Sequence, residues 1–157
     1  MPLYPIEEAE TGVWRLSFQD LLATSDFVFP LVPLTPETFH LINQETLMLM
    51  KPGAFLINVS RGSVVHEEHV AKALKQGYLA IYAADVFEME DWARKDRPQA
   101  IHQRLLQLSG STFFTPHIGS AVDSVRRKIA MDAATSIIQA LSGSIPMGAV
   151  NNPQMIP

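Results

Sequence analysis

The chain has 157 residues, of which 47% are hydrophobic and 18% charged, a composition typical of one folded domain with its own core. Its formal net charge of −4 argues against nucleic acid as a partner, and the absence of cysteine excludes disulfides, thiolate catalysis and cysteine-ligated zinc. No apolar run is long enough to span a bilayer, so we expect no membrane segment and predict a cytoplasmic protein.

The N-terminal third predicts a leader followed by the first helix and strand. Residues 1–18 form the leader, with a short strand expected over 13–18, and residues 19–25 have a helical pattern. The apolar run 26–34 predicts a strand. Pro30 lies within it and lacks a backbone N–H, which restricts this strand to a sheet edge or a bulge.

The middle of the chain alternates helices with apolar strands. Residues 36–50 are predicted to be helical, and residues 66–76 form a second helix capped by Gly77. Residues 54–60 and 78–87 are apolar at successive positions rather than at alternate ones. This pattern is typical of parallel strands that helices cover on both faces.

The C-terminal part contains one more strand and a long helix. Residues 88–110 are polar and irregular, 112–117 predict a short strand, and 120–141 predict a long amphipathic helix. The alternation of strands and helices predicts an α/β fold with a partial doubly wound parallel sheet and a long C-terminal helix.

Three strands of this sheet are followed by side chains that carry chemistry. Arg61 follows the second strand, Glu88 and Glu90 follow the third, and His117 follows the last. The carboxyl ends of parallel strands form the ligand-binding edge of open α/β sheets. A guanidinium grips an anion, and an imidazole beside a carboxylate transfers a proton near neutral pH. Together the three groups suit hydride transfer coupled to proton transfer, or activation of a water.

Taken singly, these residues are more often solvated loop residues than catalytic ones. The other histidines carry no functional signal. His66 and His69 are three residues apart without the H-E-x-x-H zinc pattern, so we expect a solvated helix face and no metal site. His66 is also a poor residue for the start of a helix. His40 and His102 have no partner that the sequence identifies.

Four segments resemble, in order, those of the D-isomer-specific 2-hydroxyacid dehydrogenases. They are DFVFPLVPLTPETFHLIN (26–43), INVSRGSVV (57–65), LAIYAADVFEMEDW (79–92) and TPHIGSA (115–121). The resemblance covers about residues 20–150. It implies the second half of a Rossmann-type NAD-binding domain, with NAD as the cofactor.

The resemblance also implies roles for single residues. Arg61 would bind the substrate anion, His117 would be the acid/base, and Glu90 would be the carboxylate partner of His117. The family's spacing from Asp85 selects Glu90 rather than Glu88. The residues implied to line the cofactor cleft are Val32, Pro33, Val59, Ser60, Arg61, Asp85, His117 and Gly119.

Within the family, the phosphonate dehydrogenase subgroup is the most similar, because the run EMEDWARKDRP (88–98) lacks the proline that usually follows the catalytic glutamate. This implies oxidation of phosphite to phosphate with hydride transfer to NAD. Arg61 would hold the phosphite and His117 would activate the attacking water. Two alternatives stay open: a D-2-hydroxyacid dehydrogenase, and a non-catalytic fragment.

The fragment alternative rests on what is absent from the sequence. No G-x-G-x-x-G segment is present to bind the cofactor pyrophosphate, so we expect the chain alone to bind NAD weakly. Residues 19–118 would be a partial NAD-binding domain, and 119–157 would return to an absent substrate domain. An incomplete sheet exposes an apolar edge, so we also expect a homo-oligomer, most simply a dimer in which 1–18 are rearranged.

Overall fold

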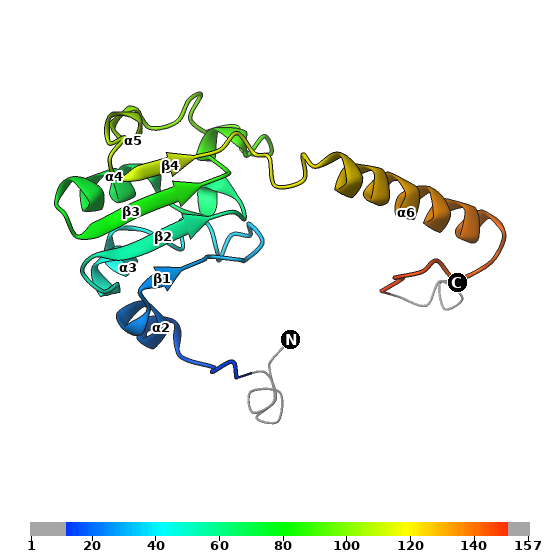
Figure 1. Cartoon of the computed structure of the whole chain (residues 1–157), viewed down its shortest axis with the longest axis horizontal. Coiled ribbons are helices and arrows are strands. Elements are labelled where there is room, and N and C mark those ends of the chain that lie inside the picture. Colours follow the sequence, from blue (N-terminus) through cyan, green and yellow to red (C-terminus); the bar gives the residue numbers. More distant parts are fainter. Residues whose placement is uncertain (1–11, 151–157) are drawn as a thin grey trace. The chain divides into compact units, whose positions relative to one another are not determined.

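The computed structural model describes residues 12–150 of the chain and divides into two compact units, residues 1–116 and 117–157. The first unit holds a four-stranded parallel sheet in the order β1-β2-β3-β4 (Figure 1). The strands are β1 (Phe27–Val28), β2 (Ala54–Asn58), β3 (Leu79–Ala84) and β4 (Thr112–Phe114). The helices are α2 (Phe18–Thr24), α3 (Gln44–Leu49), η1 (Gly62–Val64), α4 (Glu67–Lys75), η2 (Glu88–Glu90), α5 (Gln103–Gln107) and α6 (Asp123–Leu141).

The parallel α/β fold is therefore confirmed, but the helices cover the sheet differently from our expectation. The strands follow one another across the sheet in chain order, and right-handed crossovers then place every connecting helix on the same face. Helices α3, α4 and α5 form this layer, in which each contacts the next. On the opposite face Phe55 and Ile57 of β2 are only half-buried. The prediction that helices cover both faces of the sheet is thus wrong for this unit.

The core lies between the sheet and the helix layer. Alternate residues of β2 are fully buried, and the hydrophobic faces of α3 and α4 pack against them. The largest fully buried apolar side chains are those of Leu22, Ile42, Leu56, Val64, Val65, Val70, Tyr82, Val86 and Leu105.

The N-terminal elements differ from the sequence prediction in one place. Residues 13–17 form no strand, and Phe18 instead begins α2, because the Ser17 side chain accepts a hydrogen bond from the Asp20 backbone N–H and caps the helix. Residues 1–11 of the predicted leader lie outside the described residues. Strand β1 lies at the edge of the described sheet, one of the two arrangements that Pro30 allowed, but it ends at Val28, two residues before Pro30.

The helix predicted over 36–50 begins only at Gln44. Residues 36–40 form a turn, and His40 has a φ of 50°, which a helix cannot accommodate. Asn43 then caps α3 by accepting from the backbone N–H of Glu45 and Thr46. The predicted C-terminal end of the second helix is confirmed, since Gly77 follows α4 with a φ of 70°.

The second unit contains α6 and the segments that flank it. None of the α6 side chains is buried, and many of its apolar residues are exposed. No helix within residues 12–150 is both long enough and apolar enough to cross a membrane.

Candidate functional site

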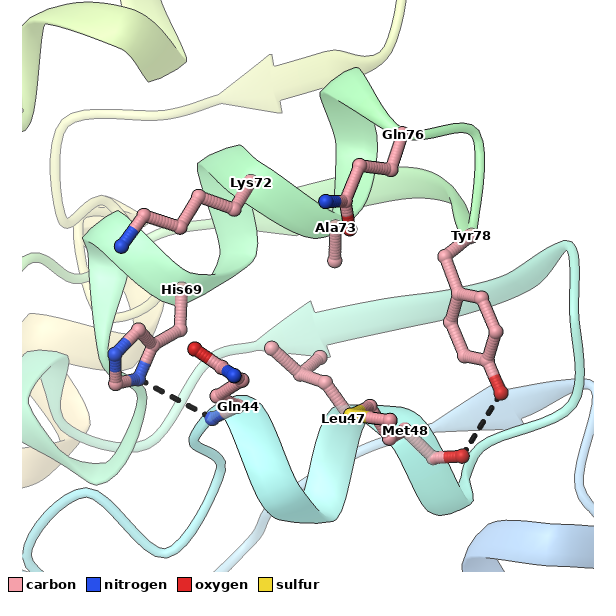
Figure 2. Close-up of a pocket in the computed structure, with 8 residues that line it drawn as sticks. All are labelled: Gln44, Leu47, Met48, His69, Lys72, Ala73, Gln76 and Tyr78. Carbon is pink, nitrogen blue, oxygen red and sulfur yellow. Dashed lines mark hydrogen bonds between the residues drawn. The ribbon is translucent and has the colours of Figure 1, made fainter.

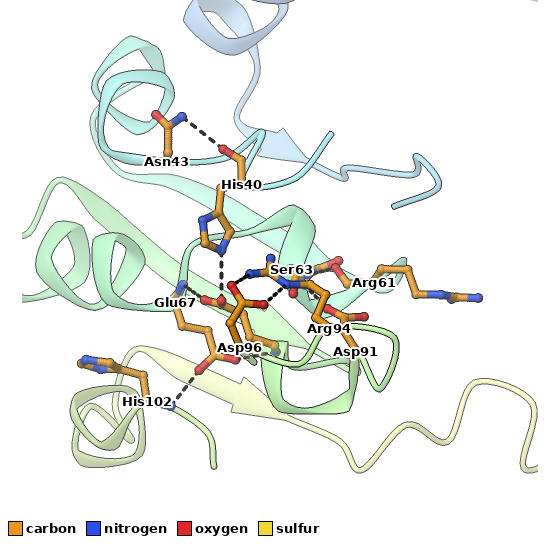
Figure 3. Close-up of polar contacts among 11 residues, drawn as sticks. His40, Asn43, Arg61, Ser63, Glu67, Asp91, Arg94, Asp96 and His102 are labelled. Atoms are coloured by element: carbon orange, nitrogen blue, oxygen red, sulfur yellow. Dashed lines mark hydrogen bonds and ion pairs between the residues drawn. The ribbon is translucent and has the colours of Figure 1, made fainter. Parts of the chain in front are cut away.

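A buried asparagine fixes the turn that follows β2 and carries Arg61. Asn58 ends the strand and is fully buried; its Nδ2 donates to the Arg61 carbonyl oxygen at 3.0 Å, and its Oδ1 accepts from the Ser60 N–H at 3.2 Å. The Arg61 guanidinium is exposed and donates to the Ser60 carbonyl at 2.7 Å. Figure 3 shows that it extends away from the buried polar groups. The Arg61 backbone is therefore fixed while its charge remains accessible to an anion.

Sequence reasoning did not assign Asn58 a role. The signal that could have identified it is its place as a polar residue inside the apolar run AFLINVS. A buried amide needs hydrogen-bond partners, and these come from the turn that follows the strand.

Gly62 allows the Arg61 turn to contact the turn that follows β3. A Cβ at Gly62 would lie 1.9 Å from the Phe87 carbonyl carbon and 2.4 Å from the Glu88 nitrogen, so only glycine fits. The Ser63 N–H then donates to Asp91 Oδ2 at 2.7 Å. These contacts hold the segment that carries Arg61 against the segment that carries Glu90. Neither Gly62 nor Asp91 was singled out from the sequence.

The two glutamates of η2 have different surroundings. Glu88 is buried, its Oε2 lies 2.9 Å from His40 Nε2, and its Oε1 accepts from the Glu67 N–H at 2.8 Å. Glu90 is half-buried at the end of η2. Glu88 is thus occupied by contacts within the fold, whereas the more exposed Glu90 is the residue that the resemblance selects.

Asp85 lies where β3 ends and is tied to both neighbouring strands. Its N–H donates to the Asn58 carbonyl at 3.0 Å, and its Oδ1 accepts from the Thr115 hydroxyl. The Thr115 N–H donates to the Ala84 carbonyl at 3.0 Å. The Asp85 carboxylate is therefore fixed at the carboxyl edge of the sheet.

Four further residues of the predicted cofactor cleft follow the ends of β1 and β2. Val32 is half-buried, while Pro33 is exposed and its carbonyl accepts from the Thr38 hydroxyl at 2.6 Å. Val59 is 49% exposed, and Ser60 is half-buried. An accessible apolar side chain beside fixed polar groups suits a flat, partly polar ligand.

His117 and Gly119 belong to the second unit, and His117 is exposed, with a φ of 53°. A positive φ is uncommon outside glycine and is concentrated at functional positions. The first unit thus brings Arg61, Glu90 and Asp85 to one edge of the sheet, and the approach of His117 to them stays a prediction.

His66 and His69, expected on a solvated face, are instead half-buried in a cluster of three histidine rings. The ring centroids of His40 and His66 are 4.4 Å apart, and those of His66 and His69 are 3.7 Å apart. His69 Nδ1 accepts from the Gln44 N–H at 3.2 Å. The prediction failed because the partners come from residues about 25 positions away in sequence. No group of three potential metal ligands within residues 12–150 is arranged to hold a metal ion.

Burial shifts the pKa values of this cluster. Desolvation lowers the pKa of His66, and the neighbouring His40 and His69 lower it further. Desolvation raises the pKa of Glu67, although hydrogen bonds from the His102 and Glu88 N–H groups oppose that shift. Figure 3 shows these contacts between α4 and the 88–102 segment. Burial therefore shifts the balance at both positions toward the neutral form relative to the unfolded chain.

A separate pocket of about 320 Å³ lies between α3 and α4 (Figure 2). Its floor contains Leu47 and Ala73, and Lys72 and Gln76 line its α4 side. It contains none of the predicted site residues, so it gives no support to the site at the strand ends.

Comparison with known proteins agrees with the fold and with these segments. Residues 3–119 match the model of the D-isomer specific 2-hydroxyacid dehydrogenase, NAD binding domain. The chain is 41% identical over 147 residues to a glyoxylate reductase from Thermococcus onnurineus. The aligned residues cover 94% of this chain and 41% of the relative.

Two solved structures are also similar. The holo form of D-mandelate dehydrogenase from Rhodotorula graminis has a TM-score of 0.81 at 28% identity, covering 98% of this chain and 43% of that one. D-lactate dehydrogenase from Aquifex aeolicus, complexed with NAD and lactic acid, has a TM-score of 0.75 at 28% identity, covering 90% of this chain and 44% of that one.

The chain thus spans less than half the length of these relatives, and nothing in the similarities points to phosphonate dehydrogenase in particular. The matched segment includes Arg61, Glu90 and His117. The chain belongs to the NAD-binding domain of the D-isomer-specific 2-hydroxyacid dehydrogenases, a family of NAD-dependent enzymes.

Proposed function

We propose that this chain provides the nicotinamide half of an NAD-dependent dehydrogenase that interconverts a small 2-hydroxy acid and its 2-oxo acid. The observation that carries the proposal is the contact between the Arg61 turn and the Glu90 turn, through Gly62 and the Ser63–Asp91 hydrogen bond. An anion-binding guanidinium and a carboxylate are thereby held at one sheet edge in a chain of this family.

The residues would divide the reaction as follows. Arg61 binds the substrate carboxylate with its exposed guanidinium. His117 would take the proton of the hydroxyl group during oxidation and return it during reduction, with Glu90 as its proposed carboxylate partner. A bound NAD would supply the acceptor for the hydride that leaves C2 of the hydroxy acid, so that the products would be a 2-oxo acid, NADH and a proton.

The cofactor site would use the fixed groups along the same edge. Val32, Pro33 and Val59 would offer apolar surface to the nicotinamide ring, and Ser60 and Gly119 are the further residues that the proposal assigns to the cofactor site. The Asp85 carboxylate, which Thr115 orients, would accept a hydrogen bond from the carboxamide. The donor and acceptor set of this edge fits the reactive end of NAD.

The test uses the chain itself and a fusion in which it replaces the matching segment of the Thermococcus onnurineus glyoxylate reductase. We expect the fusion to oxidise NADH with glyoxylate, His117→Asn to abolish turnover, and Arg61→Ala to raise KM and slow turnover. We expect the chain alone to bind NADH weakly and to turn over little. A folded fusion that binds NADH yet does not reduce glyoxylate would contradict the proposal.

A second candidate is phosphite oxidation, which the sequence after Glu90 favours. The run EMEDWARKDRP (88–98), in which Asp91 and Trp92 follow Glu90, resembles that of phosphonate dehydrogenase. Arg61 would then hold the phosphite oxygens, and His117 would remove a proton from the water that attacks phosphorus as hydride leaves. Phosphite-dependent NAD reduction by the same fusion, without glyoxylate reduction, would favour this candidate over the first.

A further inference from the structure

Asp91 connects the two turns that carry the proposed catalytic residues. Its carboxylate is buried, with 8% of the residue exposed, and its Oδ2 accepts from the Ser63 N–H at 2.7 Å (Figure 3). Ser63 is the second residue after Arg61, and Asp91 directly follows Glu90. One buried hydrogen bond therefore joins the immediate neighbourhoods of both residues.

The backbones of the two turns are already in contact at Gly62. A Cβ there would overlap the Phe87 carbonyl group, so the two segments have no gap between them. Contact alone does not prevent the turns from sliding past each other or separating. The hydrogen bond from the buried Ser63 N–H to the Asp91 carboxylate opposes such movement, because breaking it would bury two polar groups that no longer bond to each other.

Further contacts within the 88–97 loop hold the residues around Asp91. Arg97 Nε donates to the Met89 carbonyl at 3.0 Å, and the Arg97 guanidinium lies 4.2 Å from the centre of the Trp92 ring. The Arg94 N–H donates to the Asp91 carbonyl at 2.8 Å. The loop is thus braced by contacts of its own. The Glu88 carboxylate bonds it to Glu67 at the start of α4, and the Asp91 carboxylate bonds it to Ser63, two residues after Arg61.

We propose that Asp91 is a positioning residue that sets the placement of Arg61 relative to Glu90, and through it the alignment of the bound substrate anion. The proposal rests on the function proposed above for Arg61 and Glu90.

The structural test compares Asp91→Ala and Asp91→Asn in the 157-residue chain by amide NMR. Asp96→Asn is the matched control, because Asp96 is an exposed carboxylate of the same loop that pairs with Arg94 instead. We expect Asp91→Ala to speed exchange of the Ser63 amide at least about tenfold and to weaken the NOE between Gly62 Hα and the Glu88 amide.

Asp91→Asn should preserve both signals, because its amide oxygen can still accept the bond, and the control should leave them unchanged. If Asp91→Ala keeps the Ser63 exchange rate and the Gly62–Glu88 NOE, the positioning role is wrong. Should Asp91→Ala fail to fold, the Asn variant still decides the matter: loss of the NOE with retained folding would mean that Asp91 acts in some other way.

The kinetic test uses the fusion enzyme and glyoxylate. We expect Asp91→Ala to raise KM for glyoxylate at least about tenfold with a smaller fall in kcat, since Arg61 holds the carboxylate in the ground state as well as the transition state. The KM for NADH should not change, and Asp91→Asn should restore the KM for glyoxylate. A merely structural role would lower the amount of active enzyme without moving KM.

Failure of the two proposals can be told apart. If the unsubstituted fusion does not turn over glyoxylate, the proposed function fails and the NMR measurements still decide whether Asp91 fixes the two turns. If the fusion is active and Asp91→Ala leaves the KM for glyoxylate unchanged, the inference about Asp91 fails and the proposed function stands.

Discussion

Glu67 and Glu88 each accept a hydrogen bond from the backbone N–H of the other. The Glu67 N–H donates to Glu88 Oε1 at 2.8 Å, and the Glu88 N–H donates to Glu67 Oε1 at 2.9 Å. Glu67 is the first residue of α4, whose N-cap residue His66 makes no capping hydrogen bond. Glu88 therefore supplies the helix with the cap that its own sequence lacks.

This relationship predicts that Glu88 is important for stability. Glu88→Ala removes the acceptor of the buried Glu67 N–H and the partner of His40, and should lower the free energy of unfolding by about 3 kcal/mol. Urea unfolding at neutral pH measures it. Glu68→Ala, which removes an exposed carboxylate of the same helix, should leave the midpoint nearly unchanged. Equal effects of the two variants would contradict the prediction.

Glu67 should make stability fall as pH rises. Because burial raises its pKa, the folded state binds the proton more tightly than the unfolded chain does. This contribution is present below the ordinary glutamate pKa and is lost as pH rises through the raised value. Glu67→Gln loses one hydrogen bond at every pH, yet its stability relative to the unsubstituted chain should improve between about pH 4 and about pH 7. Urea titrations across that range test the slope.

His66 should act in the opposite direction. Desolvation lowers its pKa, and His40 and His69 lower it further, while Glu88 and Glu68 oppose the shift. The resulting stability is present above the ordinary histidine pKa and is lost as pH falls through the lowered one. His66→Gln should therefore lose less stability than the unsubstituted chain on going from about pH 7 to about pH 5. An identical acid dependence of both proteins would rule this out.

Gly62 should tolerate no side chain. Gly62→Ala would drive the Arg61 turn away from Phe87 and should cost about 3 kcal/mol. Gly110→Ala is the matched control, because nothing lies within 4 Å of its added Cβ and its φ is not positive. Thermal unfolding of the two variants gives the comparison, and a stable Gly62→Ala protein would show that the two turns are not in firm contact.

The free edge of β1 should cause association. Within residues 12–150, β1 pairs only with β2, and Phe27, Phe29 and Leu31 beside its open edge are 60%, 51% and 69% exposed. We expect sedimentation at micromolar concentration to show a dimer. Leu31→Lys should weaken it, whereas Leu106→Lys, at an exposed residue of α5, should not. A monomer at all concentrations would contradict this.

The sequence predicted the elements that periodicity and apolar character define. Strands β2 and β3 and helices α4 and α6 lie within the predicted ranges, because their signals are local. The strand expected at 13–18 was wrong, since Ser17 and Asp20 form a cap that outweighs the β-forming residues Val13 and Trp14. The one-sided helix layer could not be predicted either, because it depends on the order of strands across the sheet.

The candidate site was predictable only in part. The position of Arg61, Glu90 and Asp85 after strand ends follows from the general rule for parallel sheets. The groups that fix them, such as Asn58 and Asp91, act through partners that become neighbours only on folding. The same holds for the stacked histidines, whose burial depends on packing between distant segments.

The exposed segment between β4 and α6 has a consequence for proteolysis. Residues 116–122 are exposed and contain neither helix nor strand, and they lie at the boundary between the two units. A protease that cuts before large apolar residues would find Ile118 and Val122 there. Cleavage before Val122 would release α6 but leave the entire sheet, Arg61, Glu90 and His117 on one fragment, so any loss of activity would report on what the helix contributes.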